Sequence, residues 1–298
     1  MEIANRTKEL SPTRKKIKRL FKNKLTIVGF VIIVVIVITA ILAPYIAPHP
    51  ESITGEINFL SMLLPPSSEY FFGTDDIGRD IFSRVLYGAC YSLLMGIVVL
   101  TVAILIGVPL GLIAGYWGGR VNSVIMRITD IFLAVPSIVL AMVVSAILDP
   151  SLLTTMVAIS FSWWPWFTRL VQAETLNIKN EQYIKASQGM GASKFRTTFR
   201  EVLPNVIPTI IVKATTDMGF VILTGASLGF LGLGPKPPAP EWGNMVAEGR
   251  VFLPTQWWVS VFPGLAIVLT VLGFNLFGDG LRDLFDVEID YEVLEYDK

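Results

Sequence analysis

Few residues of this 298-residue sequence have the types and spacing that catalysis needs. It has one histidine, His49, between two prolines, and one cysteine, Cys90, so neither a cluster of metal ligands nor an internal disulfide is expected. It has no serine elbow and no G-x-x-x-x-G-K-S/T loop, the usual cradle for ATP phosphates. We therefore predict that the chain is not an enzyme and binds no cofactor or metal of its own.

The ionisable pair Lys213 and Asp217 is unusual because it falls inside an apolar stretch, residues 206–230. Charges within a membrane span are costly and usually face a bundle interior or a water-filled cavity. One interpretation is a structural pair near the cytoplasmic end, with Lys213 reaching outward to the aqueous boundary. The structural pair is the favoured interpretation, because Lys213 lies only about two helical turns from Asn205. The other places Asp217 beside a translocation path.

The composition points to a membrane protein. Only 16% of the residues are charged, 53% are hydrophobic, and the mean hydropathy is +0.61. A soluble domain has about a quarter of its residues charged, and several windows here exceed the roughly 18 apolar residues that mark a membrane-spanning helix. We expect an all-α polytopic membrane protein. The net charge of zero hides a basic N-terminal segment and an acidic C-terminal one.

The apolar runs predict six membrane-spanning helices. A basic tail before the first run predicts a cytoplasmic N-terminus, and the run is longer than the apolar core of a typical cleaved signal peptide, the alternative. The expected order is a basic tail, 1–24; a first span, 25–47; an outer segment with an amphipathic helix, 48–88; a core, 89–285; and an acidic tail, 286–298. The core holds spans at about 89–116, 125–148, 152–170, 206–230 and 259–277, a cytoplasmic loop, 173–205, and a second outer segment, 231–258.

The basic residues between the spans are distributed unevenly, which supports both termini being cytoplasmic. The cytoplasmic loops hold Arg120, Lys179, Lys185, Lys194, Arg196 and Arg200, and the outer segments hold only Arg79, Arg84, Lys236 and Arg250.

The fourth predicted span contains Trp163, Trp164 and Trp166 around Pro165. Aromatic residues near a membrane boundary normally act as anchors. If these tryptophans lie deeper, Trp163 and Trp164 are candidates to line a pathway together with Lys213.

A polar, basic segment, residues 181–204, interrupts the apolar core. Small residues between Ala186 and Ala192 would let another backbone approach, and Phe195, Phe199 and Val202 recur at helical spacing. Two short helices are expected, broken near Gly191, the second capped by Ser193 and ended by Pro204. The segment suits a docking element for another protein; the alternative is an ordinary amphipathic loop on the membrane surface.

This segment resembles a cytoplasmic loop of bacterial ABC importer permeases, whose pattern is E-A-A, three residues, G, nine residues and I-x-L-P. Lys185, Ala186 and Ser187 fall on the first three positions, and Gly191 and the pair Leu203–Pro204 match later ones. Lys185 replaces an acidic residue, Ser187 an alanine, and Glu201 an apolar residue. The resemblance implies a coupling helix that sits in a groove on an ATPase subunit. The implied coupling residues are Tyr183, Lys185, Ala186, Ser187, Gly189, Gly191, Ala192, Ser193, Leu203 and Pro204.

Two outer segments resemble the peptide/nickel branch of these permeases. Residues 73–88 match its pattern G-T-D-x-x-G-R-D-x-x-S-R-x-x-Y-G, and residues 232–250 match a second motif of the branch. The matched positions include Asp75, Arg79, Asp80, Arg84, Trp242, Asn244 and Arg250. From the residues alone, the first segment is an amphipathic start to the second span, in which Asp80 and Arg84 can pair on one helix face.

The resemblance implies a type I importer permease with six transmembrane helices in the bacterial inner membrane. It further implies a homologous second permease, two ATPase subunits that bind ATP and Mg, and an extracellular solute-binding protein, with no nucleic acid partner. Di- and oligopeptides are the expected substrates, and nickel or oligosaccharides the alternatives within the branch. A secondary transporter or channel that works without ATP, and an integral membrane enzyme, are the alternatives outside it.

Overall fold

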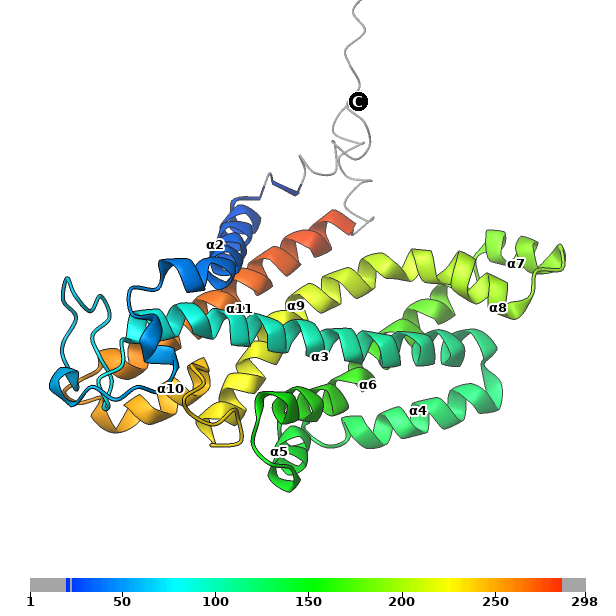
Figure 1. Ribbon diagram of the computed structural model, residues 1–298. Helices are drawn as coiled ribbons and strands as arrows, with labels where there is room; N and C mark the ends of the chain where they lie inside the picture. Colours follow the sequence, from blue (N-terminus) through cyan, green and yellow to red (C-terminus); the bar gives the residue numbers. More distant parts are fainter. Residues whose placement is uncertain (1–19, 22, 286–298) are drawn as a thin grey trace, which may run out of the picture.

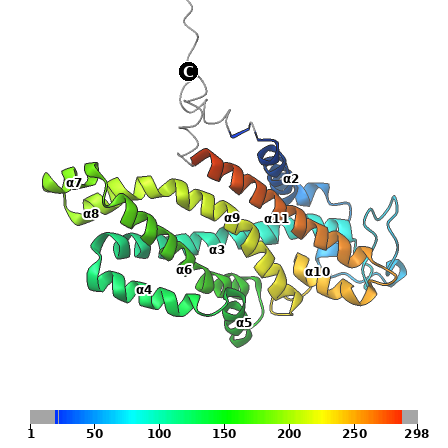
Figure 2. The same cartoon turned by 180° about the vertical axis from the view of Figure 1, so that it is seen from behind.

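The computed structural model describes residues 20–21 and 23–285, which form an all-α protein (Figures 1 and 2). The basic tail is described only at its end, and the acidic tail lies outside the described residues. The helices are α2 (Lys24–Ile46), α3 (Ile81–Trp117), α4 (Gly119–Leu133), α5 (Ser137–Ile147), α6 (Leu152–Ile178), α7 (Gln182–Gly189), α8 (Lys194–Arg196), α9 (Leu203–Phe230), α10 (Trp242–Gly249) and α11 (Trp258–Phe285). Short 3₁₀ turns lie at Pro50–Ile53, Phe59–Ser61 and Arg250–Phe252.

Helix α3 lies at the centre and makes its most extensive contact with α6. Gly107, Gly111 and Gly115, four residues apart on one face of α3, let the two backbones approach. A Cβ at Gly107 would lie 2.5 Å from the carbonyl oxygen of Trp164, and one at Gly111 would lie 2.7 Å from that of Thr168. Small residues at helix interfaces allow this close packing in membranes.

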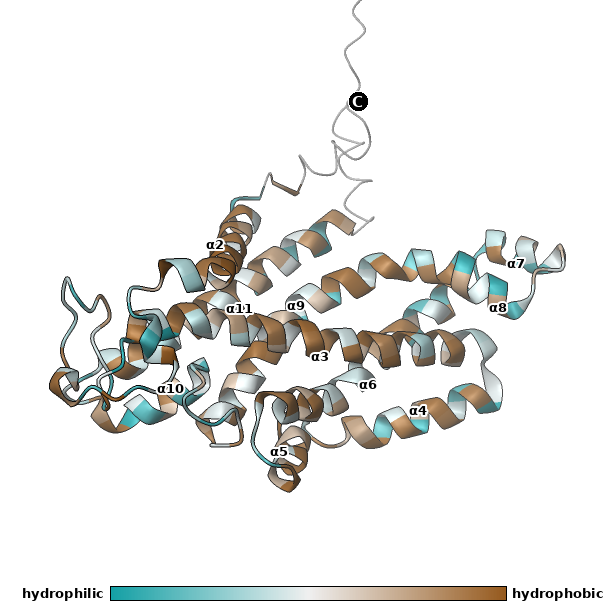
Figure 3. Cartoon of the chain, viewed as in Figure 1, coloured by the Kyte–Doolittle hydropathy of each residue, from teal (hydrophilic) through white to brown (hydrophobic). Residues whose placement is uncertain are grey.

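Helices α3 and α9 run the length of the molecule (Figures 1 and 2). The short helices α7 and α8 lie at one end, while α10 and the segment before α3 lie at the other. Apolar residues dominate the long helices, and polar residues gather at both ends (Figure 3). This distribution is that of a multi-pass membrane protein.

Four helices are long and apolar enough to cross a membrane: α2, α3, the continuous helix Lys194–Phe230 that contains α9, and α11. The pair α4 and α5 makes a fifth if its two parts form one span. The remaining predicted span falls in α6, which has 27 residues but is not among these helices. The count of six spans and the cytoplasmic position of both termini stay predictions.

The third predicted span, residues 125–148, is not a single straight helix. Helix α4 ends at Leu133, α5 begins at Ser137, and the two are bent by 81°. Pro136 explains the break, because it has no N–H to donate and disfavours helical geometry at Val135 before it.

The prediction that Pro204 ends a short helix was wrong, although Ser193 does cap its start: its Oγ accepts from the N–H of Arg196 at 3.3 Å. From Lys194 the chain continues as one helix to Phe230, through a π-helical turn at Thr197–Val202. A proline normally clashes with the carbonyl four residues earlier. The wider π turn immediately before Pro204 relieves that clash.

Candidate functional site

The loop between α6 and α9 is rich in polar residues and carries a few large apolar side chains that are exposed. Tyr183 is 49% exposed, Met190 84% and Phe195 67%. Tyr183 lies in α7, Met190 directly follows it, and Phe195 lies in α8. These two helices lie at one end of the molecule (Figure 1). Exposed apolar groups grouped on a polar tip are typical of a surface that another protein covers.

Specific contacts hold this tip against the bundle. Ile184 is fully buried and anchors α7. The Ser187 hydroxyl donates to Glu201 Oε1 at 2.6 Å, and Gln188 Nε2 donates to the Tyr116 hydroxyl at the end of α3 at 2.8 Å. Ser187 and Glu201 are two of the three departures from the family pattern, and they bond to each other. The two polar side chains at these positions therefore satisfy each other.

The small residues of the tip leave open space. A Cβ at Gly189 or at Gly191 would have no heavy atom within 4 Å. Gly191 has a φ of +89°, which suits glycine, while Gly189 is helical and carries no such constraint. Ala186 is also exposed. A partner could therefore approach the backbone closely here.

The other predicted coupling residues divide into two groups. Lys185 and Ser193 are exposed on the tip and Ala192 is half-buried, beside them. Leu203 and Pro204 instead lie in the first turn of α9, beyond the π turn. The structure thus places the ending of the pattern in the long helix rather than on the exposed tip.

The structure brings Lys213, Asp217 and Trp163 together between α9 and α6. Lys213 Nζ lies 2.7 Å from Asp217 Oδ1, and the Trp163 indole N–H donates to Asp217 Oδ2 at 2.9 Å. Asp217 is 2% exposed, whereas the Lys213 side chain is 32% exposed and its Nζ lies 5.7 Å from the centre of the Trp166 ring. Both carboxylate oxygens are occupied, so the group ties two helices together.

Trp164 does not join this group. It is buried, and its ring lies 5.1 Å from the ring of Phe132 in an edge-to-face contact. The structure therefore assigns Trp164 to packing between α4 and α6.

At the other end of the molecule, four charged residues form a buried cluster, here called the outer ion cluster: Asp75, Arg79, Arg84 and Glu248. Arg79 Nε lies 2.6 Å from Asp75 Oδ2, and Arg79 Nη2 lies 3.1 Å from Glu248 Oε2. Arg84 lies 3.6 Å from one oxygen of each carboxylate. Arg79 is 4% exposed and Arg84 1%. The cluster joins the start of α3 to the end of α10.

The predicted pairing of Asp80 with Arg84 was wrong, because helix capping occupies Asp80. Its Oδ2 accepts from the N–H of Ser83 at 2.8 Å, and it is the N-cap of α3. A separate amphipathic helix is also not observed at this point: α3 begins at Ile81 and continues to Trp117. N-cap residues satisfy a backbone donor that the helix itself leaves free.

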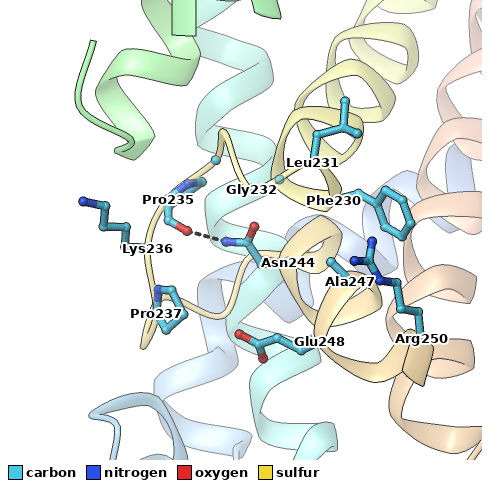
Figure 4. A pocket seen from close by; sticks show the side chains of 12 residues that line it. Phe230, Leu231, Gly232, Pro235, Lys236, Pro237, Asn244, Ala247, Glu248 and Arg250 are labelled. Atoms are coloured by element: carbon cyan, nitrogen blue, oxygen red, sulfur yellow. Dashed lines mark hydrogen bonds between the residues drawn. The ribbon is translucent and has the colours of Figure 1, made fainter. Parts of the chain in front are cut away.

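A pocket of about 560 Å³, the outer pocket, lies between α10 and the chain that follows α9 (Figure 4). Lys236 lines it from the loop, and Glu248 and Arg250 line it from the α10 side. Asn244 donates from Nδ2 to the carbonyl of Pro235 and so holds the loop. The Arg250 guanidinium lies 5.2 Å from the centre of the Phe230 ring.

Trp242 is a buried residue that packs α10 against α3. It is 2% exposed, packs on Gly88 of α3, and donates from its indole N–H to the Val85 carbonyl at 3.0 Å. Trp242 thus packs α10 on α3 and Asn244 holds the loop wall of the outer pocket, while Arg250 is the exposed one of these three residues.

The sequence analysis missed Glu241. Its carboxylate caps α10, accepting from the N–H of Gly243 at 2.9 Å and of Asn244 at 2.8 Å, and it is 1% exposed. Burial raises the pKa of Glu241 to about 7, although the two backbone donors lower it. A carboxylate directly before a helical stretch was the available signal.

Residues 107–291 match the family model described as "Binding-protein-dependent transport system inner membrane component". Residues 11–66 match the model "N-terminal TM domain of oligopeptide transport permease C".

Several known proteins resemble this chain in sequence over most of their length. The chain is 47% identical over 277 residues to a dipeptide transport system permease protein of Alkalihalophilus pseudofirmus, covering 93% of this chain and 90% of the relative. It is 46% identical over 264 residues to a probable D,D-dipeptide transport system permease protein of Escherichia coli (89% and 88% covered). It is 39% identical over 282 residues to an oligopeptide transport system permease protein of Bacillus subtilis (95% and 92% covered).

A solved structure, an inward-facing conformation of the MetNI methionine ABC transporter, contains a chain with the same fold. The TM-score is 0.57 at 19% identity, over 68% of this chain and 97% of that one. At this identity the likeness concerns the fold.

Proposed function

Because the chain belongs to the binding-protein-dependent transport system inner membrane components, and among them to the oligopeptide and dipeptide permeases, we propose that it forms part of the membrane pathway of an ATP-driven peptide importer. In this proposal a homologous second permease completes the pathway, and an extracellular solute-binding protein delivers the peptide. Two ATPase subunits bind ATP and Mg, and the assembly lies in the bacterial inner membrane.

The exposed tip around α7 carries the proposal of ATP coupling. Its apolar side chains Tyr183, Met190 and Phe195 are uncovered in this chain, and its glycines leave room for a partner backbone. Residues 182–193 would sit in a groove on an ATPase subunit, and Ile184 would carry the force into the bundle. The Ser187–Glu201 bond fixes α7 to the π turn that leads into α9.

Within the bundle, α9 is the element that would convey this movement. It continues from the tip without interruption, and the bond between Asp217 and Trp163 attaches it to α6. We place Asp217 beside the translocation path in this proposal, with the partly exposed Lys213 facing it. Asp217→Asn keeps the shape and removes the charge, so transport should fall at normal protein level. Unchanged uptake would count against a pathway role and favour a structural pair.

The coupling proposal is best tested at Gly189 rather than Gly191. A side chain at Gly191 would also strain the backbone, because its φ is +89°. Gly189→Trp adds bulk in open space, and Gly189→Ala is the matched control. In the assembled transporter, reconstituted in vesicles, Gly189→Trp should uncouple ATP hydrolysis from peptide uptake. Gly189→Ala should leave the two coupled. Full uptake coupled to ATP hydrolysis in Gly189→Trp would contradict the proposal.

The assembly itself can be tested by affinity purification of the tagged chain in mild detergent, followed by mass spectrometry. The proposal expects a second permease, two ATPases carrying the phosphate-binding loop that this chain lacks, and a solute-binding protein. Recovery of this chain alone, even after crosslinking with ATP analogues present, would instead favour a transporter that works without ATP.

A further inference from the structure

The outer pocket has an excess of positive charge. Lys236 and Arg250 line it, and neither has an ion pair among the residues that the structure describes. The only carboxylate in the lining is that of Glu248, and its Oε2 lies 3.1 Å from Arg79 Nη2 and 3.6 Å from Arg84 Nη2. Since Asp75 and Glu248 balance those two arginines, the outer ion cluster is neutral. The charge left at the α10 side of the pocket is that of Arg250, and the Lys236 side chain points away from it (Figure 4).

We propose, building on the proposed function, that the outer pocket binds the terminal carboxylate of the transported peptide and that Arg250 is its main ligand. An arginine offers two parallel N–H donors that match the two oxygens of a carboxylate. The Phe230 ring, 5.2 Å from the guanidinium, holds that group in place. The Lys236 side chain starts from the loop and points away from Asn244 and Glu248, so it leaves Arg250 as the nearer cation (Figure 4).

The shape of the pocket suits a peptide backbone rather than a particular side chain. Its volume of about 560 Å³ falls in the range of small-molecule sites. Among the glycines that line it, Gly232 is exposed and a Cβ there would have no heavy atom within 4 Å, so a ligand can approach the main chain at that residue. Every unmodified peptide has a terminal carboxylate whatever its sequence. Recognition of that group would admit peptides of many sequences and reject neutral solutes.

The pocket also lies where binding could affect coupling. Gly229 and Phe230 form the last turn of α9, the helix that begins beside the tip around α7. A ligand held between this turn and α10 would contact the helix that we propose to convey movement.

The test compares two ligands in two permeases. The complete transporter, with its solute-binding protein, is reconstituted in vesicles, and uptake of alanyl-alanine is compared with uptake of its C-terminal amide. Arg250→Gln is the test variant and Arg250→Lys keeps the charge without the paired donors. Arg120→Gln removes an exposed arginine from the predicted cytoplasmic turn as the control. Because the same solute-binding protein serves all variants, its own preference cancels in the ratios.

We expect the acid-to-amide preference to fall about tenfold in Arg250→Gln, a factor typical of a lost charged hydrogen bond. It should fall less in Arg250→Lys and stay unchanged in Arg120→Gln. An unchanged preference in Arg250→Gln would overturn the inference. So would an equal loss for both ligands, the pattern expected if Arg250 contacts an acidic residue of the solute-binding protein. If the wild-type transporter takes up neither ligand, the proposed peptide function fails and this inference fails with it.

Discussion

Removing the charge of Glu248 should destabilise the protein by a predictable amount. The carboxylate lies 3.1 Å from Arg79 Nη2 and 3.6 Å from Arg84 Nη2, and both guanidinium groups are almost completely buried. In Glu248→Gln, Asp75 becomes the only carboxylate facing two buried cations. Breaking a buried ion pair costs about 3 to 5 kcal/mol. The lower figure, about 3 kcal/mol, applies here because the Glu248 side chain is 27% exposed and a glutamine can still accept from Arg79.

The assay is thermal unfolding of the purified protein in detergent, followed by loss of its monodisperse peak in gel filtration. For a chain of this length 1 kcal/mol corresponds to roughly 2 °C, so Glu248→Gln should lower the midpoint by about 6 °C. Glu69→Gln is the matched control because Glu69 is exposed and has no ion pair among the described residues. The difference should persist at high salt, since buried pairs are screened little. Midpoints for the two variants within about 1 °C of each other would refute the reasoning.

Three further perturbations have defined outcomes. Gly88→Ala should displace the indole of Trp242, which packs directly on that glycine, and cost about 1 to 3 kcal/mol, measured as a lower unfolding midpoint and altered tryptophan fluorescence. Burial raises the pKa of Glu241 from 4.5 to about 7, so the folded state holds this proton more tightly than the unfolded state does. The free energy of unfolding should therefore fall, by on the order of 3 kcal/mol, as the pH rises from about 4.5 through 7. Unfolding of Glu241→Gln, measured across that pH range, should lack this dependence. Ser187→Ala leaves the Glu201 carboxylate without its hydroxyl donor and should speed amide hydrogen exchange in α7 several-fold. Unchanged exchange rates would show that this hydrogen bond does not hold the tip.

The sequence predicted the features that depend on neighbouring residues. Hydropathy alone located most of the long apolar helices, because twenty apolar residues in succession have few alternatives in a membrane. Local spacing predicted the Ser193 cap and the approach of Lys213 to Asp217, four residues apart. These contacts are set by helix geometry and need no knowledge of the tertiary fold.

Contacts between distant residues could not be predicted in this way. Trp163 and Asp217 are 54 residues apart, and Arg79 and Glu248 are 169 apart. Whether such polar groups meet depends on how the helices pack. For the same reason the sequence allowed Asp80 to pair with Arg84, while the structure uses it as an N-cap and gives Arg84 other partners.

The prolines show why helix ends were hard to predict. Pro136 lies at an 81° bend, yet Pro204 lies within a continuous helix, and Pro109 and Pro165 lie inside α3 and α6. In a membrane bundle, neighbouring helices and local π or 3₁₀ adjustments compensate the missing N–H. A proline therefore marks a place where a helix can bend, and packing decides whether it does.

The continuous helix from Lys194 to Phe230 links the two ends at which we propose that partners and substrate bind. Its 37 residues span about 55 Å. One end is fixed to α7 through the Ser187–Glu201 bond, and the other packs on Glu241 at Gly229. Along this length the π turn at Thr197–Val202 is the only segment of the described helix that departs from α-helical bonding, and such turns inside α-helices are frequent at functional sites. Movement imposed on the tip must therefore either pass through that turn to Asp217 and the outer pocket or be absorbed in it. The Ser187–Glu201 bond joins α7 to the last part of the turn, so movement of α7 reaches Glu201 without passing through residues 197–200, which favours transmission.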